Sequence, residues 1–185
     1  MKAAEQGYAE GQFNLGIHFE EGLGVARSEA EAFRWYRKAA DQGDAEAQVK
    51  MGGFLCEGRG VAQDYVKGAQ WIRKAAAQGN MLAQCQLGAF FGEGRGVTQS
   101  YKEAALWYKK SAEQGFAGAQ GQLAILYKFG WGVAQNEDEA ARWYKKAAEQ
   151  DDMMAQYYKL QGMSSPTGND TQLRTARRYI NATDP

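Results

Sequence analysis

The side chains that most often carry out catalysis are scarce in this chain of 185 residues. It holds one histidine, His18, and two cysteines, Cys56 and Cys85. These are too few for a recurring Ser/His or Cys/His pair, a zinc cluster or a framework of disulfides. No Gly-x-Ser-x-Gly, Ser-x-x-Lys or phosphate-binding Gly-x-x-x-x-Gly-Lys motif is present. We therefore assign no catalytic residue and expect no metal and no cofactor.

Three glutamates form the most regular set of reactive side chains. Glu21, Glu57 and Glu93 each precede a pair of glycines and recur every 36 residues. Such a row of carboxylates has the chemistry to hold a cation, although a solvated acidic ridge is the simpler interpretation. An enzyme or small-molecule receptor built on this chain would have to use Glu57, Glu93 or the two cysteines, and this class stays open as the alternative.

The two cysteines are not expected to form a disulfide. Cys56 and Cys85 occupy places in the repeating pattern that differ by seven residues, about 10 Å of helix rise, which exceeds disulfide reach. Two free thiols favour a reducing compartment, so a cytoplasmic location is slightly favoured. A periplasmic or secreted location stays open, since a signal peptide removed upstream of Met1 would leave no trace in this sequence.

Charge and composition exclude other classes of protein. Lysine plus arginine and aspartate plus glutamate both number 22, so the formal net charge is zero. Proteins that wrap nucleic acid are usually basic, and the basic pairs of this chain, such as Lys109 and Lys110, are balanced by nearby acids. No uncharged apolar run approaches the roughly 18 residues of a membrane span. No nucleic acid and no membrane insertion are therefore expected.

The elements that position these side chains repeat every 36 residues. Trp35, Trp71, Trp107 and Trp143 share this spacing, and a Gly-x-Gly-Val segment occurs four times. Apolar residues fall at helical spacing before each Gly-x-Gly-Val segment and again around each tryptophan. Each repeat is therefore predicted to form two helices, over about residues 8–20 and 28–42 in the first repeat.

Glycines have two predicted roles in each repeat. The first glycine of Gly-x-Gly-Val ends the first helix with a positive φ, and the second permits a tight turn. A further glycine, Gly16, Gly52 or Gly88, lies on the apolar stripe of the first helix in three repeats. Because glycine inside a helix costs about 1 kcal/mol relative to alanine, we expect it to admit a bulky tryptophan or tyrosine of a neighbouring helix.

The whole pattern resembles a known repeat family. Ala-x-x-x-Leu-Gly, Gly-x-Gly-Val and Ala-x-x-Trp-Tyr-x-Lys-Ala-Ala-x-Gln-Gly follow one another, and the best copy ends at 104–115. This pattern is similar to the Sel-1-like repeat (SLR), a relative of the tetratricopeptide repeat, over about residues 1–163. The resemblance implies an all-α fold, a right-handed α-solenoid of helix-turn-helix repeats. It also implies a bacterial scaffold or adaptor that binds a protein or peptide and is not an enzyme, or alternatively an immunity or regulatory protein that inhibits a toxin or an enzyme.

One solenoid domain is expected. Residues 1–7 match the tail of a preceding repeat, residues 8–43, 44–79, 80–115 and 116–151 form four repeats, and residues 152–185 hold a partial repeat and a C-terminal capping helix at 171–183. Because no polar cap precedes the first repeat, its open face is a candidate for self-association. Four positions depart from the pattern: Gly68 replaces alanine, Ile72 replaces tyrosine, Ala124 replaces glycine and Asp151 replaces glycine.

The expected binding surface is a concave groove lined by the first helices, as in other α-solenoids. Positions off the packing stripe of these helices vary in chemistry from repeat to repeat; they are Asn14, Ile17, His18, Lys50, Phe54, Gln86, Phe90, Gln122, Ile125 and Leu126. The residue between the two glycines also varies, which adds Arg59, Arg95 and Trp131 as turn contacts. We expect the two phenylalanines to supply apolar contacts, and Lys50 and the two glutamines to supply hydrogen bonds. Trp131 could instead cover the loop before the capping helix.

Overall fold

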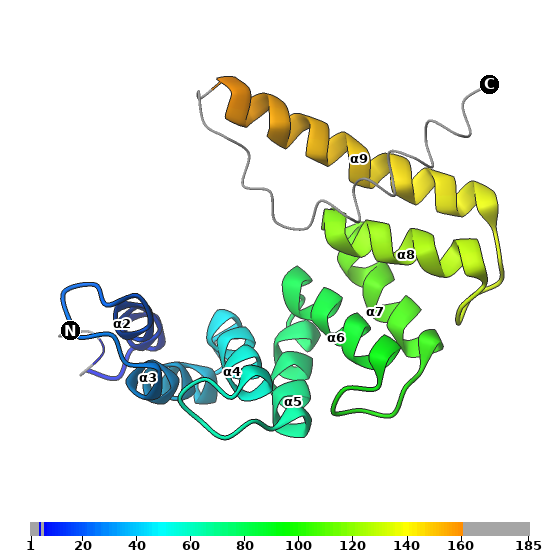
Figure 1. Cartoon of the computed structure of the whole chain (residues 1–185). Coiled ribbons are helices and arrows are strands. Elements are labelled where there is room, and N and C mark those ends of the chain that lie inside the picture. The colour runs from blue at the N-terminus through cyan, green and yellow to red at the C-terminus, as the bar shows by residue number, and fades with distance from the viewer. Residues whose placement is uncertain (1–3, 5, 161–185) are drawn as a thin grey trace. The chain divides into compact units, whose positions relative to one another are not determined.

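The computed structural model describes Ala4 and residues 6–160, and the chain divides into two compact units, residues 1–99 and 100–185. The first unit contains α2 (Ala9–Glu21), α3 (Glu29–Asp41), α4 (Ala45–Glu57), α5 (Tyr65–Ala77) and α6 (Met81–Glu93). The second contains α7 (Tyr101–Glu113), α8 (Ala117–Phe129) and α9 (Glu137–Leu160). Within each unit, helices adjacent in sequence pack on one another (Figure 1). The described residues contain no strand, which confirms the predicted all-α fold of helix-turn-helix repeats.

The glycine of the apolar stripe lets the two helices of a repeat approach closely. A Cβ atom on Gly16 of α2 would lie 2.6 Å from Cδ1 of Tyr36 on α3, which is closer than real Cβ atoms come. On α4, a Cβ atom on Gly52 would overlap the side chain of Ile72 on α5 in the same way. The predicted close approach is therefore confirmed in these two repeats, and the residue that fills the space is Tyr36 or Ile72.

The Gly-x-Gly-Val turn uses its two glycines for different purposes. The first, at 22, 58, 94 and 130, ends its helix in the left-handed region with φ of 68–75°. The second also has a positive φ, and in three repeats it lies directly against backbone. A Cβ atom on Gly60 would lie 2.5 Å from the carbonyl carbon of Glu29 and 2.6 Å from the nitrogen of Ala30. The second glycine therefore allows the turn of one repeat to pack on the start of the preceding repeat's second helix.

A buried glutamine near the start of each first helix joins it to the helix before it. The Nε2 group of Gln48 donates to the carbonyl oxygen of Ala40 at 3.3 Å, and its Oε1 accepts from Nε2 of Gln78 at 2.9 Å. Gln120 makes the same two bonds, to Ala112 at 3.2 Å and from Gln150 at 3.1 Å. The glutamine that recurs every 36 residues near the end of each second helix therefore supplies the donor of a repeated side-chain clamp.

The lysines of the second helices lie over the repeating tryptophans. Lys38 lies 3.7 Å from the ring centre of Trp35, and Lys74 lies 3.9 Å from that of Trp71. The pairs Lys110–Trp107 and Lys146–Trp143 repeat the contact at 4.3 and 4.4 Å. Each lysine follows its tryptophan by three residues, which places both on one side of the helix. One lysine of each basic pair therefore covers an aromatic ring through a cation–π contact.

The end of the fourth repeat differs from the prediction that a partial repeat begins at residue 152. In the preceding repeats the second helix stops before a glycine with a strongly positive φ, 92–96° at Gly43, Gly79 and Gly115. Asp151 takes that place in the fourth repeat, and α9 runs through it as one helix of 24 residues. An aspartate adopts a positive φ far less readily than glycine, so the helix continues instead of turning. The predicted capping helix at 171–183 lies outside the described residues. No helix in the described part of the chain is both long and apolar enough to cross a membrane.

Two glycine substitutions separate the role of the backbone conformation from that of close packing. Gly24 and Gly60 have φ of 72° and 62°, so alanine should cost about 1–2 kcal/mol of unfolding free energy at either position. A Cβ atom on Gly24 meets nothing within 4 Å, whereas one on Gly60 overlaps the preceding repeat. We expect Gly60→Ala to lose a further 1–3 kcal/mol or so in urea unfolding. Equal losses for the two variants would contradict the packing role.

Candidate functional site

Three residues predicted to bind a partner line one pocket of the first unit. The pocket has a volume of about 460 Å³, and Gln86, Phe90 and Arg95 contribute to its wall. It lies between α4 and α6, with residues such as Gly53 of α4 and Ala89 of α6 on its two sides and Ile72 of α5 also in its lining. The structure therefore brings together one part of the predicted groove as a real depression.

The structure corrects two of the predicted contacts. Phe54 is 1% exposed and Leu126 is 5% exposed, so neither offers a free surface to a partner. Phe54 packs against the rings of Phe33 and Tyr36 at centroid distances of 6.4 and 5.5 Å. The guanidinium of Arg59 covers it at 4.3 Å. Because α3 supplies two aromatic rings at this place, the slot is closed in the second repeat, whereas Phe90 remains partly exposed in the third.

The other predicted contacts do not gather at this pocket. Asn14 and His18 line a different pocket of the first unit together with Leu23. The Nδ1 atom of His18 lies 2.7 Å from the carbonyl oxygen of Leu23, which can only accept, so Nδ1 carries the proton. Ile17 packs on the core of the first unit. Gln122 and Ile125, in the second unit, are partly exposed.

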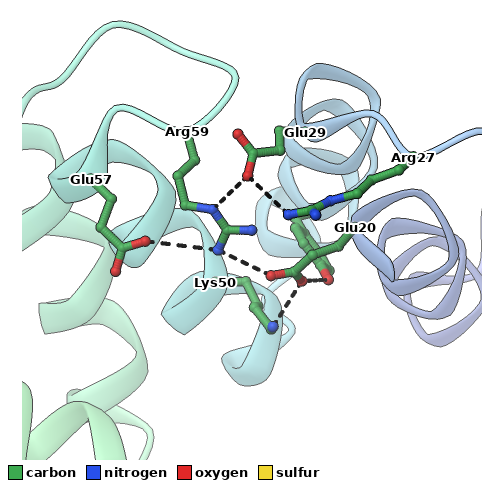
Figure 2. Close-up of polar contacts among 7 residues, drawn as sticks. Glu20, Arg27, Glu29, Lys50, Glu57 and Arg59 are labelled. Atoms are coloured by element: carbon green, nitrogen blue, oxygen red, sulfur yellow. Dashed lines mark hydrogen bonds and ion pairs between the residues drawn. The ribbon is translucent and has the colours of Figure 1, made fainter. Parts of the chain in front are cut away.

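Lys50 and Arg59 belong to a polar network at the junction of the first and second repeats (Figure 2). At its centre is Glu20, which is 6% exposed. Its carboxylate accepts from the Tyr36 hydroxyl at 2.5 Å and from Nζ of Lys50 at 2.8 Å, and it lies 3.1 Å from Nη1 of Arg59. Arg59 also donates through Nε to Glu29 at 3.0 Å. The network therefore joins α2, α3, α4 and the turn after α4.

The charges of this network determine the protonation of its two buried acids. Burial alone would raise the pKa of Glu20, but the hydrogen bonds from Lys50 and Tyr36 and the positive charge of Lys50 outweigh it, so the pKa is lowered. Burial and the hydrogen bond to the Glu20 carboxylate raise the pKa of Tyr36 far above its ordinary range. Glu20 is therefore ionised at neutral pH, and Tyr36 keeps the proton that it donates.

The pocket occupies the same place one repeat further along, where this network is missing. A shift of 36 residues replaces Ile17 by Gly53, Glu20 by Cys56, Glu29 by Tyr65, Tyr36 by Ile72 and Lys50 by Gln86. All five replacing residues line the pocket. Most of them are smaller or less polar than the residue that they replace, so the second junction lacks the side chains that fill the first. The pocket is therefore a junction between repeats that the chain's own side chains leave open.

The open junction keeps two groups able to form strong polar contacts. Arg95, in the place of Arg59, is exposed at the rim, and its Nε lies 2.5 Å from a carboxylate oxygen of Glu93. The side-chain oxygen of Gln86 is buried and has no hydrogen-bond partner among the described residues. A buried polar atom without a partner is costly, so a ligand that satisfies Gln86 would gain affinity there.

The candidate catalytic side chains lack the environment that would activate them. Burial and the nearby Glu57 raise the pKa of the Cys56 thiol, and burial raises the pKa of Cys85 to about 11. Both cysteines are free thiols. A reactive cysteine requires a lowered pKa, so neither thiol resembles a nucleophile. Among the described residues, no three His, Cys, Asp or Glu side chains are placed to share a metal ion.

Sequence reasoning missed Glu20 and Tyr36, the centre of the filled junction. Glu20 follows no repeated pattern, because its counterparts one and two repeats on, Cys56 and Gly92, share none of its chemistry. A signal was present nonetheless, since Glu20, Tyr36 and Lys50 all change together in the next repeat. The replacement of alanine by Gly68 also depends on a residue of another helix, because a Cβ atom at Gly68 would overlap the Cys56 sulfur.

The remaining predicted contact, Trp131, lies in the second unit within a cluster of exposed aromatic rings. It is 45% exposed, and its ring stacks on Phe129 at 5.1 Å and lies 5.3 Å from Tyr101. Both neighbours are themselves exposed, at 53% and 38%. The alternative that Trp131 covers the loop before the capping helix concerns residues outside the described part of the chain.

Removing the Glu20 charge should change how stability depends on pH. Since the pKa of Glu20 is lowered from 4.5 on folding, its contribution is complete above that value and is lost as pH falls through the folded pKa. Glu20→Gln should lower the unfolding free energy at pH 7 by about 2 kcal/mol and flatten its decline in acid. Glu57→Gln, at a carboxylate that is 62% exposed, is the control and should change the unfolding free energy by less than about 0.5 kcal/mol. Parallel pH profiles for wild type and Glu20→Gln would contradict the assigned network.

Comparison with known proteins places these repeats among solved structures. A protective antigen of uropathogenic Escherichia coli with an SLR fold is 36% identical, with a TM-score of 0.80, and the match covers 97% of this chain and 39% of that protein. A Sel1 repeat protein from Oxalobacter formigenes is also 36% identical, with a TM-score of 0.78, over 99% of this chain and 76% of that one. An immunity protein of Pseudomonas aeruginosa is 21% identical over 98% of this chain and 70% of its own, with a TM-score of 0.55, and shows likeness of fold alone. A search of curated proteins gave no match.

The family model for the Sel1 repeat matches four times, at residues 9–44, 45–80, 82–116 and 117–152. These matches cover the helices that build both units, so the resemblance predicted from the sequence is confirmed. Sel1 repeats generally serve as scaffolds for protein–protein interaction. The chain belongs to the Sel1 repeat family.

Proposed function

We propose that this chain is a non-enzymatic protein-interaction module that holds a segment of a partner protein in the pocket between α4 and α6. One observation carries the proposal: equivalent junctions of the same chain are filled in one case and open in the other. At the first junction, Ile17, Glu20 and Tyr36 occupy the space. At the second, Gly53, Cys56 and Ile72 leave a pocket of about 460 Å³.

The size and lining of the pocket suit one side chain of a bound segment and its flanking backbone. Its interior offers apolar contact through Ala89 and Phe90, and its polar groups Glu57, Gln86 and Arg95 provide orientation. In specific binding sites, apolar side chains supply contact while a few placed polar groups fix the orientation of the ligand. The environment of the thiols supports a binding role over the alternative of an enzyme that uses Cys56 or Cys85.

The first of the similar structures is much longer than this chain, which spans 39% of its length. The activities and partners of that protein therefore provide no direct assignment for this one. The proposal is limited to the pocket that the described residues form, and a partner is expected to be a protein because Sel1 repeats generally bind proteins.

Filling the pocket should abolish partner binding without unfolding the protein. Gly53→Ile restores the residue of the first repeat, and a Cβ atom at Gly53 meets nothing within 4 Å, so the helix should accept it. We expect the unfolding free energy to stay level or rise by about 0.5 kcal/mol, because glycine is a poor helix residue. A protein that wild type captures from host lysate should be lost from the captured set with Gly53→Ile.

Gly121→Ile is the matched control for this experiment. Gly121 also lies within a helix, α8, and a Cβ atom there meets nothing within 4 Å, but it lies in the other unit. This variant should capture the same protein as wild type. Capture that is equal for wild type and both variants would remove the pocket as the binding site.

A further inference from the structure

The two junctions show the same arginine in two arrangements. At the filled junction, Arg59 lies over the ring of Phe54 at 4.3 Å and contacts Glu20 at 3.1 Å. It also forms a longer ion pair with its neighbour Glu57, at 3.8 Å. At the open junction, Arg95 instead contacts the equivalent neighbour, Glu93, at 2.5 Å. The arginine therefore lies farther from its neighbouring glutamate where an inner carboxylate is available, and closer to that glutamate where none is.

The missing partner at the open junction is an acid. Cys56 stands in the place of Glu20 and Tyr65 in the place of Glu29, so both carboxylates that hold Arg59 are absent. Of the three groups that bind Glu20, the Tyr36 hydroxyl has no counterpart, since Ile72 takes its place, but the other two positions keep a donor. Arg95 replaces Arg59 unchanged, and Gln86, in the place of Lys50, has an amide that can donate. The amide of Gln86 has an unpartnered oxygen, and a rotation of the amide by half a turn would present its NH₂ group instead.

We infer that the pocket binds the side-chain carboxylate of a glutamate or aspartate on the partner segment, in the place that Glu20 takes at the first junction. This inference rests on the proposed function. Arg95 would turn from Glu93 onto the acid and cover Phe90, as Arg59 covers Phe54. A bidentate arginine–carboxylate contact gives geometric specificity as well as affinity.

The acids already near the pocket are compatible with this ligand. Glu57 lines the pocket, but its counterpart Glu21 follows directly after Glu20 at the filled junction, where the buried carboxylate is stable. Glu93 must give up part of its contact with Arg95. Their side chains are 50% and 55% exposed, and ion pairs at such exposure contribute little. The exchange of Glu93 for a ligand carboxylate is therefore inexpensive.

The test uses four short peptides and the Nε–H resonance of Arg95 in ¹⁵N-labelled protein. Acetyl-Ala-Glu-Ala-amide is compared with the same peptide carrying glutamine or lysine, and with acetyl-Ala-Ala-Ala bearing a free C-terminal carboxylate. We expect a saturable shift for the glutamate peptide, with an affinity about tenfold higher than for the glutamine peptide. Arg95→Gln lacks this probe and is followed through the backbone amide resonances of Ala89 and Phe90, where the preference for glutamate should be lost. A glutamine or lysine peptide that binds as tightly, a shift with the free C-terminus alone, or no shift with any peptide would overturn the inference.

A second variant asks the same question without a ligand. Cys56→Glu supplies the missing acid from the chain itself and should displace the glutamate peptide, shift Arg95 to its bound position and raise the melting temperature. Cys56→Gln, which has the same shape without the charge, should do none of these. If Cys56→Glu leaves Arg95 unmoved, the inference fails. Loss of partner capture with Gly53→Ile but no preference for glutamate would leave the proposed function standing and overturn only the ligand class.

Discussion

A buried amide must have both its oxygen and its nitrogen satisfied, and this requirement joins the helices of neighbouring repeats. Gln48 lies 4% exposed, and it can meet the requirement only when Ala40 and Gln78 are in place on the second helices before and after it. An unpaired amide at such a site would cost more than the net gain of an ordinary hydrogen bond. The same clamp recurs at Gln12 and Gln120. The relative position of stacked helices is therefore set by directional hydrogen bonds as well as by apolar contact. The surfaces between repeats, filled or open, depend on this alignment.

The fold was largely predictable because its determinants are local and repeated. The spacing of the tryptophans and of the Gly-x-Gly-Val turns defines helices whose ends agree with the structure to about a residue. Gly16 and Gly52 were recognisable as points of close approach from their cost in a helix alone. The continuous helix α9 was not predicted, since the effect of Asp151 depends on the absence of a glycine that is otherwise needed for a positive φ. A repeated sequence pattern predicts where turns occur, but it does not predict what the chain does where one turn residue is replaced.

The candidate site was predictable only in part, since it depends on side chains from different repeats acting together. Gln86, Phe90 and Arg95 were identified because their positions vary along the repeats, and they do line one pocket. Phe54 was misplaced because the burial of a ring depends on what the neighbouring helix supplies, here Phe33 and Tyr36. Whether a junction is open depends on the summed volume of the side chains that meet there. The residue at any single position of the repeat does not show whether the space between two repeats is filled.

The glutamine clamp is electrically neutral, and this has a consequence for how such a protein can change. Ion pairs between exposed groups weaken as ionic strength rises, whereas hydrogen bonds between buried neutral amides are insensitive to it. The share of cohesion between repeats that the clamp supplies is thereby independent of the salt and acidity of the surroundings, and of the charges that a junction carries. A duplicated repeat can exchange its acids, bases and fillers, and so acquire a new specificity, while the clamp still holds it to the repeats beside it.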